Sequence, residues 1–239
     1  MEDHRNEDRP DVEAGRGDQA RTALLQAAID VFGESSLEDA TTREISRRSG
    51  QNIASIAYYF GNKEGLYHAC VGHVVEMMRG LMGPMVAEIE EELAVGAISR
   101  ARCLSRLQDM YELLAVNGFL RSETVSVSRI IMREMVRPTE AFEIFFNGPV
   151  TRFHELATEL IRRYLGRETV DQDLVIFSHT LFGQVLGFRA AREFFLRRVE
   201  WMDFGPEESS AVISVLRQNI EILLAGWRGR ERRASRSST

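Results

Sequence analysis

Apolar residues recur every three or four positions along most of this chain, and no stretch shows the two-residue alternation that is typical of a half-buried strand. Glycine and proline, the strongest turn signals, fall about one helix length apart. The pattern therefore predicts an all-α fold. We expect helices over residues 19–33, 42–49, 53–59, 63–82, 84–95, 99–117, 124–136, 139–146, 149–165, 171–198 and 207–226.

The second and third predicted helices are short and carry clear end signals. Thr41 is placed to cap the second helix, and Glu44 three residues later completes a capping box. Gly50 supplies the turn that ends this helix, and Asn52 can cap the third. Two short helices separated by about four residues and packed on a longer first helix are what a DNA-reading helix-turn-helix requires.

Helical spacing divides the side chains of this segment into an inward and an outward set. Ile45, Ile53, Ile56 and Phe60 can face a small core. The residues that then project toward a DNA groove and backbone are Asn52, Ser55, Ala57, Tyr58 and Tyr59. Many all-helical proteins contain such a helix pair, and tyrosine pairs on short helices are often packing residues, so this pattern alone leaves the function open.

Residues 21–67 resemble the DNA-binding domain of the tetracycline-repressor (TetR) family of transcriptional regulators. The matching pieces are AAIDVF in the first helix, TTREIS in the second, SGQNIASIAYYF across the turn and third helix, and GNKEGLY into the fourth. The later blocks REMVRPTEAFEIFFNGP and GQVLGFRAARE are similar to the CecR-like branch. The sequence departs from the family at Ser35-Ser36, where a glycine is usual, and at Ala57, where a tyrosine is usual.

The resemblance implies a role for each matching position. Thr42 and Arg43 begin the second helix, where a hydroxyl, a guanidinium and a helix N-terminus meet phosphate. Lys63, the only lysine in the chain, matches the family's phosphate-binding lysine. We expect Arg47 and Arg48 to be solvated, with phosphate contact as the alternative. The predicted DNA-binding residues are Thr42, Arg43, Asn52, Ser55, Ala57, Tyr58, Tyr59 and Lys63.

Composition and the resemblance together suggest four segments. Residues 1–18 are polar and acidic, which predicts a disordered leader. We expect a helix-turn-helix DNA-binding domain over residues 19–65 and a larger helical ligand-binding and dimerisation domain over residues 66–227. Residues 228–239 predict a basic, disordered tail, for which weak contact with DNA is the alternative to simple solvation.

A single headpiece reads only a few base pairs, so we expect a homodimer on a palindromic operator. Two later helices carry apolar stripes suited to a four-helix bundle with their symmetry mates, the arrangement that the family uses. The predicted dimer-interface residues are Leu174, Phe177, Leu181, Val185, Val212, Val215, Ile220 and Leu223.

The helices between headpiece and bundle are rich in methionine and phenylalanine, which suit a pocket for a small lipophilic effector and equally suit an ordinary core. The predicted pocket residues are His73, Met77, Met110, Tyr111, Met132, Met135, Phe146 and Phe153. Effector binding would shift the helix that begins at Lys63 and change the separation of the two recognition helices. The resemblance implies that the protein represses transcription and that the effector relieves this repression.

Charge, cysteine content and the lack of long apolar runs argue against several other classes of protein. The net charge of −6 disfavours indiscriminate nucleic-acid coating, although residues 21–67 with five basic and six acidic side chains still permit a local basic face. Cys70 and Cys103 form no disulfide framework or metal-ligand pattern, so we expect neither metal nor cofactor. No secretory signal and no apolar run of membrane length is visible, so we expect a cytoplasmic protein that contacts no membrane.

Two rival functions remain from the sequence. An all-helical enzyme is disfavoured because the chain lacks a phosphate-binding loop, a nucleophile elbow and metalloprotease or EF-hand patterns. A helical adaptor that uses its short-helix pair to bind protein would have the same pattern, and DNA retention separates it from a regulator. The sequence therefore predicts a ligand-responsive transcriptional regulator, with the adaptor as the alternative.

Overall fold

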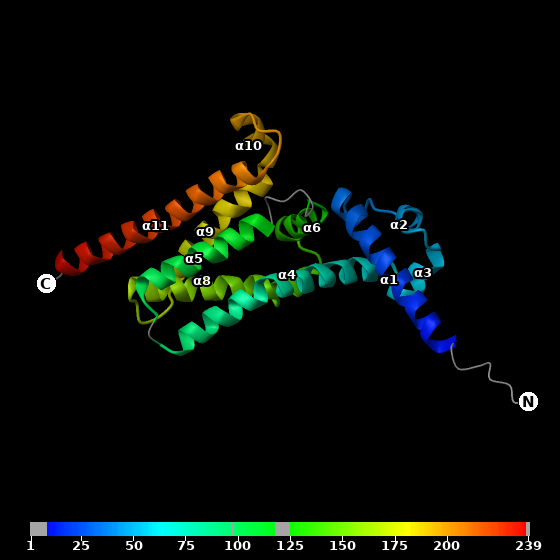
Figure 1. Ribbon diagram of the computed structural model, residues 1–239, viewed down its shortest axis with the longest axis horizontal. Coiled ribbons are helices and arrows are strands. Elements are labelled where there is room, and N and C mark those ends of the chain that lie inside the picture. The colour runs from blue at the N-terminus through cyan, green and yellow to red at the C-terminus, as the bar shows by residue number, and fades with distance from the viewer. Residues whose placement is uncertain (1–8, 97, 118–124, 238–239) are drawn as a thin grey trace, which may run out of the picture. The chain divides into compact units, whose positions relative to one another are not determined.

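The computed structural model describes the backbone of residues 9–96, 98–117 and 125–237 and side chains between 17 and 230. Every regular element in this part of the chain is a helix, as the pattern predicted (Figure 1). The helices are α1 (Arg9–Glu34), α2 (Thr42–Ser49), α3 (Ile53–Phe60), α4 (Lys63–Ala94), α5 (Arg100–Ala115), α6 (Val125–Val136), α7 (Phe142–Phe146), α8 (Pro149–Leu165), α9 (Gln172–Ala190), α10 (Arg192–Val199) and α11 (Pro206–Ser237).

The chain folds into two compact units. Unit 1 contains Met1–Glu76 and Ser126–Ile144, and unit 2 contains Met77–Val125 and Phe145–Thr239. The sequence placed one boundary between residues 65 and 66, whereas α4 continues from unit 1 into unit 2 and a later segment returns to unit 1. Helical periodicity could not reveal this division because it does not say which core a helix joins.

A buried carboxylate holds the returning segment in unit 1. Glu134 of α6 is fully buried, and its Oε1 accepts a hydrogen bond of 2.6 Å from the Tyr67 hydroxyl of α4. The backbone N–H and hydroxyl of Thr139 also donate to the Glu134 carboxylate, at 3.0 Å each. These donors replace water around the buried charge, which would otherwise be costly to bury. The cluster therefore fixes residues 134–139 against α4.

Close contact with α1 supports the same arrangement. Arg133 donates to the Phe32 carbonyl at 2.6 Å, and a Cβ on Gly33 would lie only 2.5 Å from the Ser126 Cα. The rings of Phe32 and Tyr67 meet edge to face with centroids 5.0 Å apart. Glycine at position 33 thus permits an approach between α1 and α6 that no side chain would allow.

The first helix begins earlier than the sequence predicted. The helix α1 starts at Arg9, so the expected disordered leader is wrong for residues 9–18, while residues 1–8 lie outside the described part. Pro10 falls in the first turn, where a helix does not need the missing N–H. The charged residues that follow are compatible with a helix once α1 is anchored further along the chain, because extending a helix costs little after it has been nucleated.

The last helix also extends beyond its predicted end. The helix α11 continues to Ser237, so the expected disordered tail is wrong for residues 228–237, and residues 238–239 lie outside the described part. Five of the ten residues 228–237 are arginine, and the high helix propensity of arginine allows α11 to continue past Gly226.

Pro84 does not break the fourth helix, as the sequence predicted it would. It stands inside the continuous helix Lys63–Ala94. Proline normally clashes with the Cβ of the preceding residue and with the backbone of the preceding turn. Gly83 has no Cβ, which removes the first of these clashes, and α4 therefore accommodates the ring.

Unit 2 is built around α5, α8, α9 and α11. Its core contains the rings of Tyr111 and Phe153, whose centroids are 5.3 Å apart and nearly perpendicular. Arg217 of α11 binds Asp109 at 3.0 Å and Glu112 at 2.7 Å on α5, so ion pairs join these helices beside the apolar core. Apolar burial supplies most of the driving force for packing these helices together. The ion pairs add little stability and help to fix how α11 is oriented on α5.

The predicted single helix over residues 171–198 is two helices, α9 and α10, bent by 75° at Ala191. The bend lets Phe195 of α10 pack against Phe188 of α9 at 5.1 Å. Among the described residues, no single helix has the length and apolar character needed to cross a membrane; this bent pair meets those criteria only when its two helices are taken together.

Candidate nucleic-acid interface

The ends of α2 and α3 form as the sequence predicted. The Thr41 hydroxyl accepts from the Glu44 N–H at 3.2 Å, and Asn52 Oδ1 accepts from the Ala54 N–H at 3.0 Å. Gly50 has φ of 67°, the left-handed conformation that glycine adopts without strain. The Glu44 carboxylate, however, binds arginines instead of completing the capping box.

The helix α3 buries one side chain deeply and exposes the opposite face. Ile56 is 2% exposed and packs into the core of unit 1 with Ile45, as predicted. Tyr58 is 82% exposed, and Ala54 and Ala57 are exposed beside it. A short helix with a single buried anchor and a broad open face has the shape that fits the major groove of DNA.

Two predicted positions on α3 need correction. Ile53 was expected in the core but is 46% exposed, because it lies on the same face as Ala57. Tyr59 was expected to project outward but is half-buried, with a ring centroid 4.8 Å from that of Tyr58. Its hydroxyl lies near Gly17 of α1, where an added Cβ would be 3.4 Å away. Tyr59 therefore supports the α3 face instead of forming it.

We define the α3 face as the exposed residues of α3 and its cap, and Ser55 is half-exposed at its edge. Sequence reasoning missed Ile53 and Ala54. The spacing i, i+1, i+4, i+5 would have found both once Ile56 is taken as the only deep anchor. The members of the α3 face are Asn52, Ile53, Ala54, Ala57 and Tyr58.

The arginines of α2 differ in whether their charge is already paired. Arg48 binds Glu34 at 2.6 Å and Glu44 at 2.7 Å, and Arg47 binds Glu44 at 2.7 Å. Hydrogen bonds from Arg47 and then Arg48 lower the pKa of Glu44 to about 2. Arg43 is exposed and has no ion pair among the described residues, so its guanidinium is available to a phosphate.

Lys63 lies at the first turn of α4, but its ammonium group is already engaged. Its Nζ donates to the carbonyls of Glu38 at 3.2 Å and Ala40 at 3.1 Å. These bonds hold the loop that leads into Thr41 and α2. An ammonium group has three N–H donors, so one remains for a phosphate. The lysine therefore has a structural task in addition to the predicted one.

The structure divides the predicted pocket residues between the two units and does not show them lining one cavity. Those in unit 1 are His73, Met132 and Met135, and those in unit 2 are Met77, Met110, Tyr111, Phe146 and Phe153. His73 is exposed, and Met77 and Phe146 are about half-exposed at 50% and 53%. Met110, Tyr111 and Phe153 are buried core residues. For these three, the core interpretation fits the packing.

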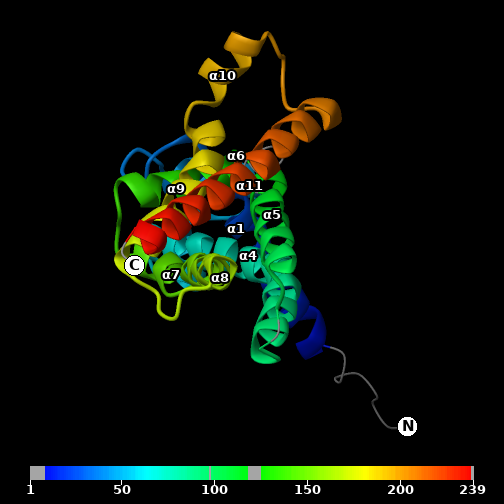
Figure 2. The ribbon, with the colours of Figure 1, turned by 90° about the vertical axis from the view of Figure 1, so that its left-hand side faces the viewer.

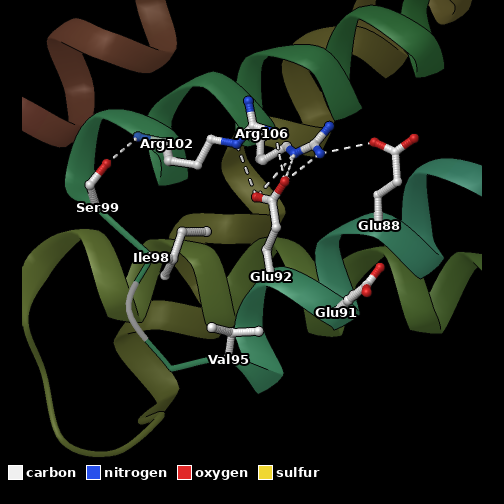
Figure 3. A pocket seen from close by; sticks show the side chains of 8 residues that line it. All are labelled: Glu88, Glu91, Glu92, Val95, Ile98, Ser99, Arg102 and Arg106. Atoms are coloured by element: carbon white, nitrogen blue, oxygen red, sulfur yellow. Dashed lines mark hydrogen bonds and ion pairs between the residues drawn. The ribbon is translucent and has the colours of Figure 1, made fainter.

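A hollow of about 650 Å³ lies elsewhere in unit 2, between the end of α4 and the start of α5 (Figure 3). Glu92 forms its centre and binds Arg102 at 2.6 Å and the largely buried Arg106. Glu88 also binds Arg106, at 2.9 Å. Hydrogen bonds from Arg102 and Arg106 lower the pKa of Glu92 to about 2. The hollow is a charged network and not the apolar pocket that the sequence predicted.

Most of the predicted dimer-interface residues are buried within the chain itself and cannot contact a second copy. The buried ones are Leu174, Leu181, Val185, Val212 and Ile220. Phe177 is half-buried against Trp227 at 4.4 Å, and only Val215 and Leu223 of the predicted set are exposed, at 52% and 39%. The most apolar stripes of α9 and α11 were predicted to pack against a second copy, but they face the core of their own chain.

A second stripe on each helix remains exposed. On both helices it follows a spacing of four and three residues, the repeat that lets helices pack side by side. Figures 1 and 2 show α9 and α11 as neighbours. We define the α9/α11 face by its exposed residues Ile176, Thr180, Gly183, Gly187, Ala190, Ala211, Val215, Gln218, Ile222 and Ala225.

Two family models match this chain. One, described as "Bacterial regulatory proteins, tetR family", matches residues 24–70. The other, described as "HTH-type transcriptional dual regulator CecR, C-terminal domain", matches residues 105–227. The first runs from within α1 to the start of α4, and the second runs from within α5 to within α11.

Whole-chain relatives agree. The HTH-type transcriptional dual regulator CecR of Shigella flexneri is 33% identical over 88% of this chain and 94% of its own length. The HTH-type transcriptional repressor KstR2 of Rhodococcus jostii is 26% identical over 86% of this chain and 90% of its own. A solved structure of a putative transcriptional regulator from Pseudomonas aeruginosa has a TM-score of 0.63 at 16% identity, covering 89% of this chain and 94% of that one, which shows the shared fold. The chain belongs to the TetR family of transcriptional regulators, in its CecR-like branch, and it is a DNA-binding regulator and not an enzyme.

Proposed function

We propose that this protein binds an inverted-repeat operator as a homodimer and represses transcription until a small effector releases it. The observation that carries the proposal is the α3 face, where an 82% exposed tyrosine stands on a short, capped helix. Membership of the TetR family supports DNA binding over the protein-binding adaptor. The 26% identical relative is named a repressor and the 33% identical one a dual regulator, so repression is the simpler starting assumption.

Each part of the headpiece has a task in this proposal. Ile53 and Ala57 supply apolar contact for thymine methyl groups, and Tyr58 reaches a base edge or phosphate. Arg43 binds the phosphate backbone beside the groove, because its charge is unpaired among the described residues. Lys63 holds the loop before α2 and offers its third donor to the opposite strand.

The α9/α11 face supports the homodimer. Gly183 and Gly187 have no heavy atom within 4 Å of a Cβ built on them, so this part of α9 is open enough for close approach of another helix. Ile176, Val215 and Ile222 are 53%, 52% and 65% exposed and provide the apolar surface. Two copies related by a twofold axis would bury these stripes in a four-helix bundle.

Operator binding tests the proposal, with variants of the α3 face and a matched control. We expect Tyr58→Ala to weaken operator binding by about ten- to a hundredfold. Arg43→Ala is expected to weaken it on all sequences and to reduce the slope of affinity against salt by about one phosphate contact. Arg152→Ala removes an exposed arginine from unit 2 and is the control. Equal loss with all three variants would contradict the interface.

The effector part of the proposal rests on a polar group in the core of unit 2. Tyr111 donates from its hydroxyl to the Ser178 carbonyl at 3.2 Å. Ser178 is fully buried, and its own Oγ has no hydrogen-bond partner among the described residues. A buried hydroxyl without a partner is unfavourable. We infer that a lipophilic effector with one polar group binds beside Ser178 when this packed part of the core opens, and satisfies the Ser178 hydroxyl.

A neutral fluorescent probe, N-phenyl-1-naphthylamine, tests this site. We expect the protein to bind the probe, and we expect Ser178→Val to reduce the affinity severalfold without unfolding the protein. Operator affinity is then measured at fixed salt with increasing probe. Operator affinity that stays constant while the probe is bound would eliminate the coupling, because a ligand shifts an equilibrium only through its different affinity for the two states.

A further inference from the structure

Residues 191–205, which we call the arm, connect the two helices of the α9/α11 face. They contain α10 and the loop that leads into α11. Figures 1 and 2 both show α10 projecting from the region where α9 ends and α11 begins. The two most exposed large apolar residues of the arm are Phe194 and Met202, at 74% and 97%. Aromatic residues and methionine are enriched in protein interfaces, and these two are among the most exposed large apolar residues that the structure describes.

The arm is held in shape by its own small core. Phe195 packs on Trp201 at 5.7 Å and on Phe204 at 5.9 Å, and the Arg192 guanidinium lies 5.3 Å from the centre of the Phe204 ring. Arg192 also forms an ion pair with Asp203. Because these contacts already order the arm, docking it on a partner requires little further loss of conformational freedom.

The position of the arm, directly after the exposed stripe of α9, indicates what kind of partner covers it. Phe194 stands four residues after Ala190, the last member of the exposed stripe on α9, so the apolar spacing of that stripe continues in sequence into the arm. The 75° bend at Ala191 then redirects it. The arm carries three arginines and three acidic residues, a balance that gives no net attraction to DNA or to an anionic membrane.

We propose that the arm clasps a second copy of this chain, with Phe194 and Met202 covered by the partner in the dimer. The inference rests on the proposed homodimer, because a copy packed on the α9/α11 face is the molecule within reach of the arm. A twofold axis makes the contact reciprocal, so each dimer contains two such clasps. The arm then adds affinity and restricts how the two headpieces are spaced.

Cysteine alkylation tests the clasp directly. Cys70 and Cys103 are buried, and burial raises the pKa of both thiols, so they give little background. We expect Met202→Cys to react at least tenfold more slowly in the dimer than in a monomer made by adding Gly183→Arg. Val95→Cys, at a position 78% exposed just after the end of α4, is the control and should react equally in both. Circular dichroism checks that each variant is folded, and Ile222→Arg replaces Gly183→Arg if that variant does not fold.

Self-association provides a second readout. We expect Phe194→Asp to raise the dimer dissociation constant by about tenfold or more, whereas Val95→Asp leaves it unchanged. Equal reactivity of Met202→Cys in dimer and monomer, with the dimer intact, would overturn the clasp and leave the proposed function standing. A wild-type protein that is monomeric at all concentrations would instead overturn the homodimer itself, and the clasp with it.

Discussion

Ile53 and Ile56 stand three residues apart on α3, yet one is 46% exposed and the other 2% exposed. Their chemistry is the same, so a pattern of apolar residues cannot separate them. Ile56 is buried in the core that α1, α2 and α3 share, while Ile53 begins the helix on the open face. Local structure was thus predictable from the sequence here, but the assignment of each apolar residue to core or surface required the packing of three helices.

This difference gives a paired prediction. We expect Ile56→Ala to lower the free energy of unfolding by about 2–5 kcal/mol, because it leaves a cavity in the core of unit 1. Ile53→Ala should change it by no more than about 0.5 kcal/mol. Urea unfolding followed by circular dichroism measures both. Similar losses for the two variants would show that Ile53 is a core residue after all.

Glu92 gives a prediction about pH. Its pKa falls from 4.5 to about 2 in the folded protein because Arg102 and Arg106 donate hydrogen bonds to it. A lowered carboxyl pKa stabilises the folded state fully above pH 4.5, and this stabilisation is lost as the pH falls through about 2. The urea midpoints of wild type and Glu92→Gln should therefore differ above pH 4.5 and converge toward pH 2. A constant difference across this range would contradict the network.

At the scale of the helices, two glycines inside helices differ in whether the surrounding structure has room for a side chain. Gly33 in α1 lies against the Ser126 backbone, where an added Cβ would come within 2.5 Å. Gly72 in α4 has no atom within 4 Å of such a Cβ. Nothing in the sequence around either residue predicts this difference, because the contact joins segments more than ninety residues apart.

The two glycines therefore form a matched test of the α1/α6 contact. We expect Gly33→Ala to destabilise the protein by about 1–3 kcal/mol, since the backbone of α6 must move to admit the methyl group. Gly72→Ala should instead stabilise it by up to about 1 kcal/mol, because alanine favours a helix. Thermal and urea unfolding decide the signs. A stabilising Gly33→Ala would mean that α6 does not pack tightly on α1.

Helix positions were largely predictable from the sequence, and the exceptions have physical causes. Pro84 was expected to end a helix, but the glycine before it removes one of the clashes on which that expectation depends. The bend at Ala191 was missed because no glycine or proline marks it; it is accompanied by the ring contacts of Phe195. Length and propensity predict helices well, whereas bends depend on contacts between distant side chains.

At the scale of the whole molecule, the two-domain plan was harder to predict. The segment 126–144 belongs to unit 1, although the family model for the C-terminal domain includes it. The buried hydrogen bond between Tyr67 and Glu134 helps to attach it, and no pattern in the sequence predicts that these two residues meet. The predicted dimer stripes lie on the two helices of the proposed face but on the opposite side of them, because the most apolar stripes are buried in the chain's own core.

The central claim is that two α3 faces read one inverted repeat. Footprinting of the DNA upstream of this gene and its neighbours tests it most directly. We expect a protected inverted repeat whose half-sites lie about one helical turn, or 34–36 Å, apart, and we expect Tyr58→Ala to lose the protection while remaining dimeric. Protection that is unchanged by Tyr58→Ala, or the absence of a protected repeat from all DNA tested, would contradict the account.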